Sequence, residues 1–311
     1  MQKFDTTPLN TAVLFLVFNR LDTTKQVFEA IKEAKPPRLY IAADGARETK
    51  HGESIKVKNV RDYIISNIDW NCEIKTLFRD SNLGCKIAVS GAIDWFFKNE
   101  EMGIILEDDC LPNQSFFVFC EKMLNKYKNN SKVNMITGTS YLFNEVETNN
   151  DYFFSRYISI WGWATWKDKW NTYDIKMKNY PEIKSTNFLD NFYFCDTYIS
   201  NIFSKYFDVA YNNEIDTWDF QWVYKCVESN KLCITPYKNL VSNIGIEGTR
   251  SSLNSPFINM ERVELLEIDN LKYDDKSFNN YTIDKILYHN VFYRFNRFSI
   301  IKKILNRMKN F

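Results

Sequence analysis

The chain has few of the residues that mark several common classes of enzyme and binding protein. Among its 311 residues there are only two histidines, His51 and His289, and neither has the serine, cysteine or acid context of a nucleophilic triad. The sequence contains no Gly-rich phosphate loop, no G-x-G-x-x-G fingerprint and no zinc-ligand spacing. These absences exclude a catalytic triad, a P-loop, a Rossmann dinucleotide site and a zinc site as the basis of function.

Paired cysteines and long apolar runs are also absent. None of the seven cysteines forms a C-x-x-C pair, and most stand in apolar runs, where a thiol behaves as a small hydrophobic group: Cys72, Cys85, Cys110, Cys120, Cys195, Cys226 and Cys233. No run reaches the ~20 apolar residues of a membrane-spanning helix. The apolar stretch 12–18 lacks the basic lead and cleavage site of a signal peptide. We therefore expect a reduced, cytoplasmic protein.

Charge is balanced overall but unevenly distributed. The net charge of +1 gives no general attraction to nucleic acid, so we expect no nucleic-acid partner. Residues 285–311 contain seven basic residues and no acidic residue, interspersed with Phe, Ile and Leu. Such a segment is typical of a helix at an anionic membrane surface, and packing on the domain or on another subunit is the alternative. We expect a basic amphipathic arm at 284–311, with peripheral contact to the inner face of the cytoplasmic membrane as one option.

The first 140 residues alternate short apolar runs with longer amphipathic ones. The pattern predicts buried strands at 12–18 and 103–106 and further strands at 38–43, 73–78 and 133–137. It predicts a helix that begins at Thr23 or Thr24 and ends by Pro36. Further helices are predicted over 56–68, 83–98 and 115–127. This alternation indicates an α/β fold with a mostly parallel sheet covered by helices on both faces.

The second half of the chain has a different composition. Residues 152–170 are dense in aromatic side chains, and helical segments are predicted near 187–205 and 220–230. No Gly/Ser linker or repeat interrupts the chain. We expect one domain over 1–283, with its two halves at 1–140 and 141–283.

Polar residues follow each predicted strand directly. In a parallel sheet the carboxyl ends of the strands share one edge, and ligands collect beyond that edge. The groups expected there are Asn19 and Arg20, Asp44 and Gly45, Arg79 and Asp80, Glu107 to Asp109, and Thr137 and Gly138.

Glu107, Asp108 and Asp109, called the acidic triplet below, are the most informative of these groups. Three adjacent carboxylates repel one another unless a cation neutralises them, and hard divalent ions prefer carboxylate oxygen. The alternative is an acid-rich loop in which Asp109 caps the helix near 112–117. Because the triplet follows a buried strand, we favour a metal site that holds the diphosphate of a nucleotide sugar.

The other strand ends offer donor-binding candidates with simpler alternatives. Asp44 suits a carboxylate that accepts hydrogen bonds from a base or ribose, although Asp-Gly is also a common turn pair. Residues 79–84, with Arg79, Asp80 and Asn82, could hold ribose and phosphate. Arg20 and Lys86 are candidate phosphate partners, or else solvated surface charges.

The second half supplies a candidate base and candidate acceptor platforms. Asp219 lies between large aromatic residues in the sequence WDFQW, where partial burial would raise the pKa of its carboxyl toward that of a general base. The alternative is a helix N-cap formed by Asp216 or Asp219. Trp161, Trp163 and Trp218 offer rings on which a sugar could stack, although such strings more often form core.

Several of these segments together resemble a known superfamily. FNR, ADG, RDSNLGCK and GIILEDDCLP resemble the GT-A nucleotide-diphospho-sugar transferases. More narrowly, they look like bacterial relatives of the family of alpha-1,3-mannosyl-glycoprotein N-acetylglucosaminyltransferase, which carries an EDD version of the DxD motif. WGWATW, WDFQW and SNIG resemble bacterial surface-polysaccharide transferases, so the likeness covers residues 12–250.

The resemblance implies roles for individual residues. Asp109 would coordinate Mn²⁺ or Mg²⁺, Asp44 would read the base, and Asp219 would be the base of an inverting displacement. The donor-binding set would be Asn19, Arg20, Asp44, Arg79, Asp80, Asn82, Lys86, Glu107, Asp108 and Arg250.

One position departs from the family pattern. Many bacterial relatives carry Thr-His after the SNIG loop, where this chain has Thr249-Arg250. Arginine cannot ligate a metal but can pair with a diphosphate, so we expect Arg250 to help neutralise the leaving group.

The expected activity is that of a hexosyltransferase-type glycosyltransferase. It would move a sugar from a UDP-sugar, UDP-GlcNAc or a relative, to a glycan or lipid-linked hydroxyl in surface-polysaccharide assembly. A sugar-1-phosphate nucleotidyltransferase is one alternative, but it would normally carry a Gly-rich phosphate loop where this chain has FNRL. A catalytically silent nucleotide-sugar-binding protein is the other, and the intact acids at the strand ends argue against it.

Overall fold

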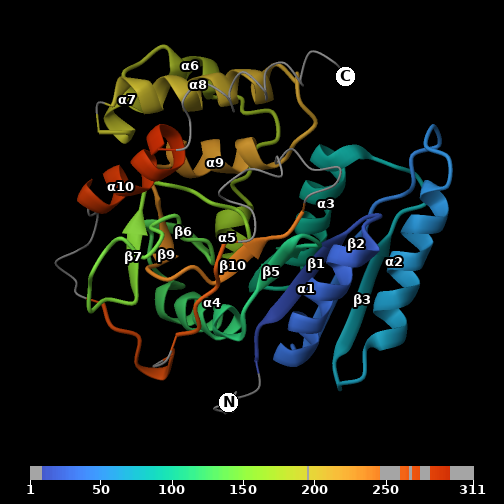
Figure 1. The fold of residues 1–311 in the computed structure, drawn as a ribbon. Helices are drawn as coiled ribbons and strands as arrows, with labels where there is room; N and C mark the ends of the chain where they lie inside the picture. The colour runs from blue at the N-terminus through green and yellow to red at the C-terminus, as the bar shows by residue number, and fades with distance from the viewer. Residues whose placement is uncertain (1–8, 195, 246–259, 266–267, 274–280, 295–311) are drawn as a thin grey trace.

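The computed structural model describes residues 9–194, 196–245, 260–265, 268–273 and 281–294 (Figure 1). Its core is one large sheet in the strand order β3-β2-β1-β4-β8-β6-β9-β7. These strands are β1 Ala12–Val17, β2 Arg38–Ala43, β3 Glu73–Phe78, β4 Met102–Glu107, β6 Val133–Thr137, β7 Tyr152–Ser155, β8 Trp163–Trp166 and β9 Leu232–Pro236. A small second sheet pairs β5 Cys110–Pro112 with β10 Val241–Asn243 in antiparallel orientation.

The sheet is mixed, with parallel pairing in its first half. β1 pairs in parallel with β2 and β4, β2 with β3, and β6 with β9. β8 lies antiparallel between β4 and β6, and two antiparallel steps leave β6 running in the direction of β4. The carboxyl ends of β1, β2, β3, β4 and β6 therefore meet at one edge, called the carboxyl edge below, as the sequence predicted.

Helices cover both faces of the sheet (Figure 1). They are α1 Leu21–Ala34, α2 Glu53–Asn67, α3 Gly84–Asn99, α4 Gln114–Tyr127, α5 Lys167–Trp170, α6 Tyr180–Lys184, α7 Phe188–Phe192, α8 Thr197–Tyr211, α9 Asp219–Glu228 and α10 Tyr281–Tyr288. A short 3₁₀ turn spans Ile268–Asn270, and a π-helical turn, His289–Arg294, continues α10. The predicted α/β class with a helix-flanked central sheet is confirmed.

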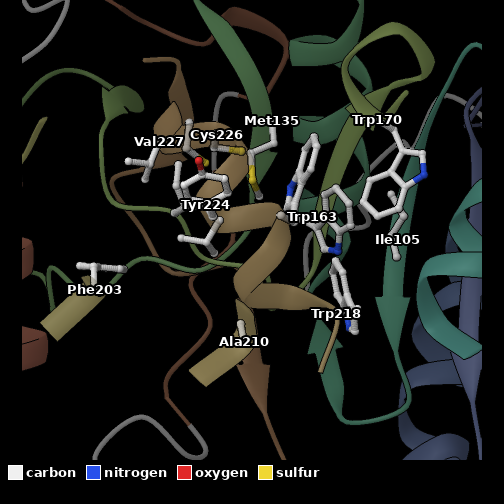
Figure 2. Packing of buried hydrophobic residues seen from close by; sticks show 14 of the residues in the cluster. Ile105, Met135, Trp163, Trp170, Phe203, Ala210, Trp218, Tyr224, Cys226 and Val227 are labelled. Atoms are coloured by element: carbon white, nitrogen blue, oxygen red, sulfur yellow. The ribbon is translucent and has the colours of Figure 1, made fainter. Parts of the chain in front are cut away.

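Alternation along the strands assigns the helices to the two faces. In β1, Val13, Phe15 and Val17 pack with α1, α2 and α4. The intervening residues Leu14 and Leu16 face α3 and the helices of the second half. On that second face the core is largely aromatic, with Trp163, Trp170 and Trp218 at its centre (Figure 2).

Two helix caps differ from the sequence prediction. Helix α1 begins at Leu21, so Thr23 and Thr24 lie inside its first turn, where the Thr24 hydroxyl donates to the Arg20 carbonyl at 2.5 Å. Asn113 caps α4 by accepting a hydrogen bond from Phe116 N at 3.1 Å. The capping alternative for Asp109 is therefore wrong.

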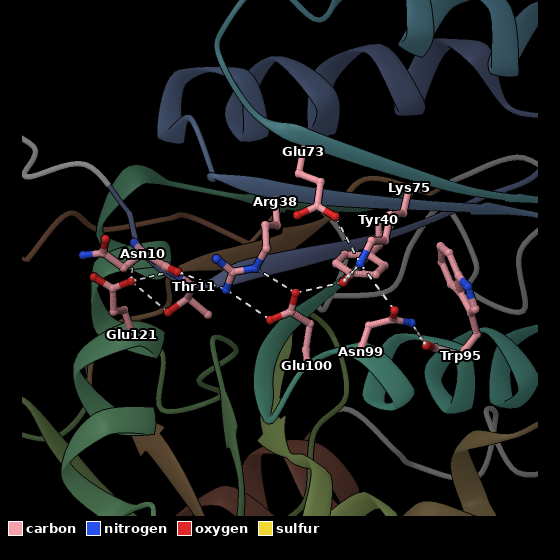
Figure 3. Close-up of polar contacts among 10 residues, drawn as sticks. All are labelled: Asn10, Thr11, Arg38, Tyr40, Glu73, Lys75, Trp95, Asn99, Glu100 and Glu121. Carbon is pink, nitrogen blue, oxygen red and sulfur yellow. Dashed lines mark hydrogen bonds and ion pairs between the residues drawn. The ribbon is translucent and has the colours of Figure 1, made fainter.

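At the opposite, amino edge of the sheet, charged side chains form ion pairs and hydrogen bonds with other residues of the chain (Figure 3). Arg38 Nε lies 2.7 Å from Glu100 Oε1, and the Tyr40 hydroxyl donates to the same oxygen at 2.8 Å. Thr11 donates from both its backbone N and its hydroxyl to Glu121 at 2.8 Å. The acids at this edge serve to join elements of the fold.

The described beginning of the predicted basic arm is part of the core. Ile283, Leu287 and Phe292 are buried, and the Phe292 ring lies 5.6 Å from that of Phe203 on α8. This is the packing alternative considered for the arm, and Phe292 is unavailable to a membrane surface. Residues 295–311, on which the membrane prediction mainly depends, lie outside the described residues. In the part of the chain that the structure describes, no helix is long and apolar enough to cross a membrane.

Asp284 attaches α10 to the sheet and makes folding stability depend on pH. Its buried carboxylate accepts hydrogen bonds from the Ser155 hydroxyl and from Arg156 N, at 3.1 Å to Oδ2. Burial raises the pKa of Asp284 to about 6, although these hydrogen bonds act against the rise. The folded state therefore holds a proton on Asp284 between about pH 4 and pH 6 that the unfolded chain has lost, so stability falls as pH rises through that window.

We predict that Asp284→Asn removes this dependence. Because the folded-state pKa lies near 6 and the ordinary value is 3.8, the ionised carboxylate costs on the order of 3 kcal/mol at neutral pH. Urea unfolding at pH 4.5 and pH 7.5 should show the variant gaining stability relative to wild type at the higher pH. Parallel pH profiles for the two proteins would contradict the prediction.

Candidate active site

The acidic triplet lies at the carboxyl edge, where β4 turns into β5. Glu107 ends β4 and is half-buried, while Asp108 and Asp109 are 3% and 7% exposed. Arg20, directly after the adjacent strand β1, donates from Nη1 to Asp109 Oδ2 at 2.9 Å. It also pairs with both carboxylate oxygens of Asp108, through Nη2 and, at 3.4 Å, through Nε. The sequence identified Arg20 as a phosphate partner, whereas here it binds two of the three acids.

Arg20 compensates only part of the negative charge. Burial opposes the charge of Arg20, but Asp108 and Asp109 outweigh that effect and raise its pKa. Burial raises the pKa of Asp108 to about 6, with Arg20 acting in the opposite direction. Burial and then the charges of Asp109, Asp219 and Asp108 raise the pKa of Glu107 to about 8. Burial and the neighbouring acids thus disfavour the ionised forms of Glu107 and Asp108.

Asp219 approaches this cluster from the second half of the chain. It is the first residue of α9 and is half-buried, and its charge contributes to the raised pKa of Glu107. Oδ1 accepts hydrogen bonds from the Thr217 hydroxyl and, at 2.8 Å, from Phe220 N. Among the described residues, no hydrogen-bond donor to Oδ2 is found. The charge of Asp219, in the second half of the chain, thus acts on Glu107, in the first half.

Asp44 organises the loop that follows β3. Its carboxylate accepts hydrogen bonds from Leu83 N at 3.0 and 3.1 Å, from Gly84 N at 3.1 Å and from Asn82 Nδ2 at 3.0 Å. A Cβ on Gly45 would lie 2.3 Å from the Ser81 backbone carbon, so the glycine permits this close approach. Both oxygens of Asp44 are engaged, and a nucleobase would have to compete with the loop for them.

Other predicted donor residues are also bonded within the chain. Asn19 donates to Glu53 at 2.8 Å, and Lys86 Nζ donates to Asn213 Oδ1 at 2.6 Å. Glu53, which the sequence did not single out, is buried beside Arg47, and hydrogen bonds from Arg47 lower its pKa to about 2. No local sequence pattern identifies Glu53, because its contact with Asn19 joins residues 34 positions apart.

Arg79 and Asp80 remain near the surface at the same edge. Arg79 is half-buried and Asp80 is exposed. The adjoining Arg61, another residue the sequence did not identify, donates from Nη2 to the carbonyls of Ala43, Asp44 and Arg79. Arg61 therefore fixes the ends of β2 and β3 side by side.

Two of the three predicted acceptor platforms are inside the core. Trp163 and Trp218 are 1% and 2% exposed, and their rings stack on each other with centroids 5.6 Å apart (Figure 2). A sugar cannot stack on rings that protein atoms already cover. Trp161 is half-buried and is the one of the three with accessible surface.

The SNIG segment lies directly beside the acidic triplet. β10 pairs with β5 so that Asn243 faces Cys110, and Ile244 N donates to the Asp109 carbonyl at 2.8 Å. Arg250 lies outside the described residues.

The donor atoms of the triplet fit a divalent ion that is shared with a substrate. Within the described ranges, no group of three or more His, Cys, Asp or Glu side chains is arranged to hold a metal ion. Glu107 and Asp109 nevertheless supply hard carboxylate oxygens within electrostatic reach of each other. Mg²⁺ and similar ions commonly bind through one or two carboxylates plus substrate phosphates, which is the arrangement these residues permit.

Comparison with known proteins gives only remote similarity. No family model matches the chain, and no curated protein matches it. The solved structure of GalNAc-T7 with UDP, GalNAc and Mn²⁺ is similar at 12% identity and a TM-score of 0.47, covering 78% of this chain and 46% of that one. The glycosyltransferase GlyE of Streptococcus pneumoniae TIGR4 is similar at 11% identity and a TM-score of 0.31, covering 97% and 64%. HddC of Yersinia pseudotuberculosis is similar at 12% identity and a TM-score of 0.31, covering 51% and 77%.

We predict that Arg20→Gln destabilises the protein and makes it more responsive to divalent ions. Removing one partner of a buried ion pair leaves the other charge buried without a partner. Because Arg20 is partly exposed, we expect the free energy of unfolding to fall by about 2–3 kcal/mol. Excess Mn²⁺ should raise the melting temperature of the variant more than that of wild type, because a cation can replace the lost charge. Arg38→Gln, which breaks the ion pair with Glu100 at the amino edge, is the control and should show no extra response to Mn²⁺. An equal response in all three proteins would contradict the prediction.

Proposed function

We propose that the chain is a metal-dependent glycosyltransferase that takes its sugar from a nucleoside-diphosphate sugar, with UDP-sugars as the first candidates. The observation that carries the proposal is that the acidic triplet, at the carboxyl edge, lies within electrostatic reach of Asp219. Glu107 and Asp109 come from the first half of the chain and Asp219 from the second. This combination supplies acids for a cation and a separate carboxylate for proton transfer.

A diphosphate can approach three carboxylates only if positive charge lies between them. Arg20 offsets Asp108 and part of Asp109. Glu107 and Asp109 would hold Mn²⁺ or Mg²⁺, which would neutralise the departing nucleoside diphosphate. Arg20 would then pair with the acids or with phosphate oxygens according to which ligand is bound.

The order of strands suggests how the donor lies along the edge. The triplet follows β4, Arg20 follows β1, and the loop held by Asp44 follows β2 and β3. Neighbouring strands are about 4.8 Å apart, so β4 and β2 are separated by about 10 Å. This distance suits a nucleoside diphosphate whose phosphates lie at the triplet and whose ribose and base lie toward Arg79, Asp80 and Asn82.

Asp219 is the proposed general base. One of its oxygens is held by Thr217 and Phe220, which orients the carboxylate. Its other oxygen would accept the proton of the acceptor hydroxyl. The hydroxyl oxygen would at the same time bond to the anomeric carbon, and the nucleoside diphosphate would leave. A mechanism with one base and one displacement inverts the configuration at the anomeric carbon. Trp161 is the candidate platform for the acceptor sugar.

The acceptor proposed is a glycan or a lipid-linked saccharide in bacterial surface-polysaccharide assembly. The proposal takes this from the resemblance of WGWATW, WDFQW and SNIG to transferases of that kind. The seven basic residues of 285–311 support peripheral contact with an anionic cytoplasmic membrane, where lipid-linked acceptors are presented.

A panel of nucleotide sugars tests the activity. The purified chain should release free nucleoside diphosphate from one donor in the presence of Mn²⁺ or Mg²⁺, and EDTA should abolish the release. Pyrophosphate formed from a nucleoside triphosphate and a sugar 1-phosphate would instead identify a nucleotidyltransferase. Nucleotide binding without turnover of any donor would identify a silent binding protein.

Two substitutions should separate the metal and base roles. Asp219→Asn should lower kcat for transfer by about 100-fold or more while the chain still binds UDP with Mn²⁺, because it removes the proton acceptor. Asp109→Asn should raise the Mn²⁺ concentration needed for half-maximal activity by about 10-fold or more, because it removes a carboxylate ligand.

Asp208→Asn provides the control for both. Asp208 lies on α8 and accepts a hydrogen bond from the Tyr180 hydroxyl at 2.8 Å, so its loss should leave both parameters near wild type. Unchanged kcat in Asp219→Asn would show that another group is the base.

A further inference from the structure

The turn between α8 and α9 is attached to the beginning of α3 through Asp216. Asp216 Oδ2 accepts a hydrogen bond from Cys85 N at 2.7 Å, and Oδ1 accepts one from Lys86 N at 2.8 Å. Lys86 returns the contact by donating from Nζ to Asn213 Oδ1 at 2.6 Å. Three hydrogen bonds therefore join the first half of the chain to the turn that precedes Asp219.

Asp216 acts as a helix cap supplied from another element. The first N–H groups of a helix have no partner inside the helix, and a carboxylate also favours the positive end of the helix dipole. Leu83, at the N-cap position of α3, provides no side-chain cap. Gly84 has φ +79°, and a Cβ there would lie 2.7 Å from Asp216 Oδ2. Glycine at position 84 thus provides both the backbone conformation and the space that this contact requires.

The cap completes a run of four consecutive amides held by two carboxylates. Leu83 N and Gly84 N donate to Asp44, which follows β2. Cys85 N and Lys86 N donate to Asp216, which precedes α9. The loop proposed to bind the donor is therefore fixed on one side by the first half of the chain and on the other side by the second half.

The same turn determines where Asp219 lies. Thr217 donates to the Asp219 carboxylate, and the buried Trp218 stacks on Trp163 in the core. A cap of α9 was one alternative predicted for Asp216, but the carboxylate oxygens of Asp216 accept from amides at the beginning of α3. The polypeptide leading into Asp219 is thus attached at two points, one in the aromatic core and one on the donor loop.

We propose that Asp216 is a positioning residue, which holds Asp219 opposite Glu107 by clamping the α8–α9 turn to the beginning of α3. The inference rests on the proposed function, in which Asp219 is the base. Asp216 would act through this attachment, since its two carboxylate oxygens accept from the first amides of α3. Its loss should misplace the base, and a misplacement of about 1 Å can reduce a rate by about 100-fold. The donor loop would remain attached through Asp44, so nucleotide affinity should change little.

Three variants test this role against a matched control. Asp216→Ala removes both hydrogen-bond acceptors, Asp216→Asn keeps one acceptor oxygen, and Gly84→Ala places a methyl group where the carboxylate lies. Asp196→Ala is the control, because Asp196 accepts from Tyr198 N and Ile199 N at 3.2 Å with the same chemistry. Asp196 lies at the other end of α8, about 20 Å along the helix from the turn.

Three measurements are needed on the full chain. They are kcat for sugar transfer, the Kd for UDP in the presence of Mn²⁺, and hydrogen exchange of a peptide that contains Cys85 and Lys86. Asp216→Ala should lower kcat by about 10-fold or more, leave Kd within about 2-fold, and accelerate exchange in that peptide. Gly84→Ala should also lower kcat and accelerate exchange there, and because Gly84 belongs to the donor loop its Kd is not used as a readout. Asp216→Asn should recover part of kcat, and Asp196→Ala should match wild type in all three measurements.

The outcomes separate this inference from the function on which it rests. An active wild type with unimpaired Asp216→Ala would overturn the positioning role alone. Equal losses of kcat in Asp216→Ala and Asp196→Ala would also overturn it, because they would reflect general destabilisation. A wild type that releases no nucleoside diphosphate from any donor would overturn the proposed function and, with it, the role of Asp216.

Discussion

Repulsion among three adjacent carboxylates is the constraint on which the site depends. Asp108 and Asp109 are buried, and burial of a carboxylate is unfavourable without a partner. Arg20 supplies that partner from the neighbouring strand, and it can do so because β1 and β4 run in parallel and end together. One guanidinium cannot balance three acids, and Asp219 adds a fourth. This excess of acids over bases at the carboxyl edge is the basis of the proposed cation site.

The rest of the structure maintains this arrangement from two sides. At the amino edge, Arg38, Glu100 and Glu121 are engaged in contacts that join strands and helices (Figure 3). At the carboxyl edge, Asp44 and Asp216 hold the loop before α3 between the two halves. The aromatic core around Trp163 and Trp218 fixes the beginning of α9. A rigid core under the candidate base is what precise proton transfer requires, since the distances to a donor and an acceptor must be held together.

Much of the sheet could be predicted from the sequence. The alternation of short apolar runs with longer amphipathic ones identified β1 to β4 and β6, and parallel pairing then placed their polar ends on one edge. β8 was not predicted, because its four residues lie within a longer aromatic run that has no strand periodicity. The burial of Trp163 and Trp218 could not be decided either, since a string of aromatic residues suits a core as well as a sugar platform.

The contacts that complete the site were beyond a reading of the sequence. Asp216 with α3, Arg20 with the triplet, and Glu53 with Asn19 all join residues that are distant along the chain. Each depends on tertiary packing, and local pattern carries no signal for it. The types of residue at the strand ends were therefore predictable, while their partners were not.

The central claim is that the acidic triplet binds a divalent cation together with the donor diphosphate. The most direct measurement is a crystal structure of the chain with UDP and Mn²⁺, with anomalous scattering used to locate the manganese. We expect one manganese peak beside Glu107 and Asp109, bridged to the UDP phosphates, with the uridine directed toward Arg79 and Asn82. UDP bound elsewhere, or bound at this edge with no manganese near Glu107 and Asp109, would contradict it.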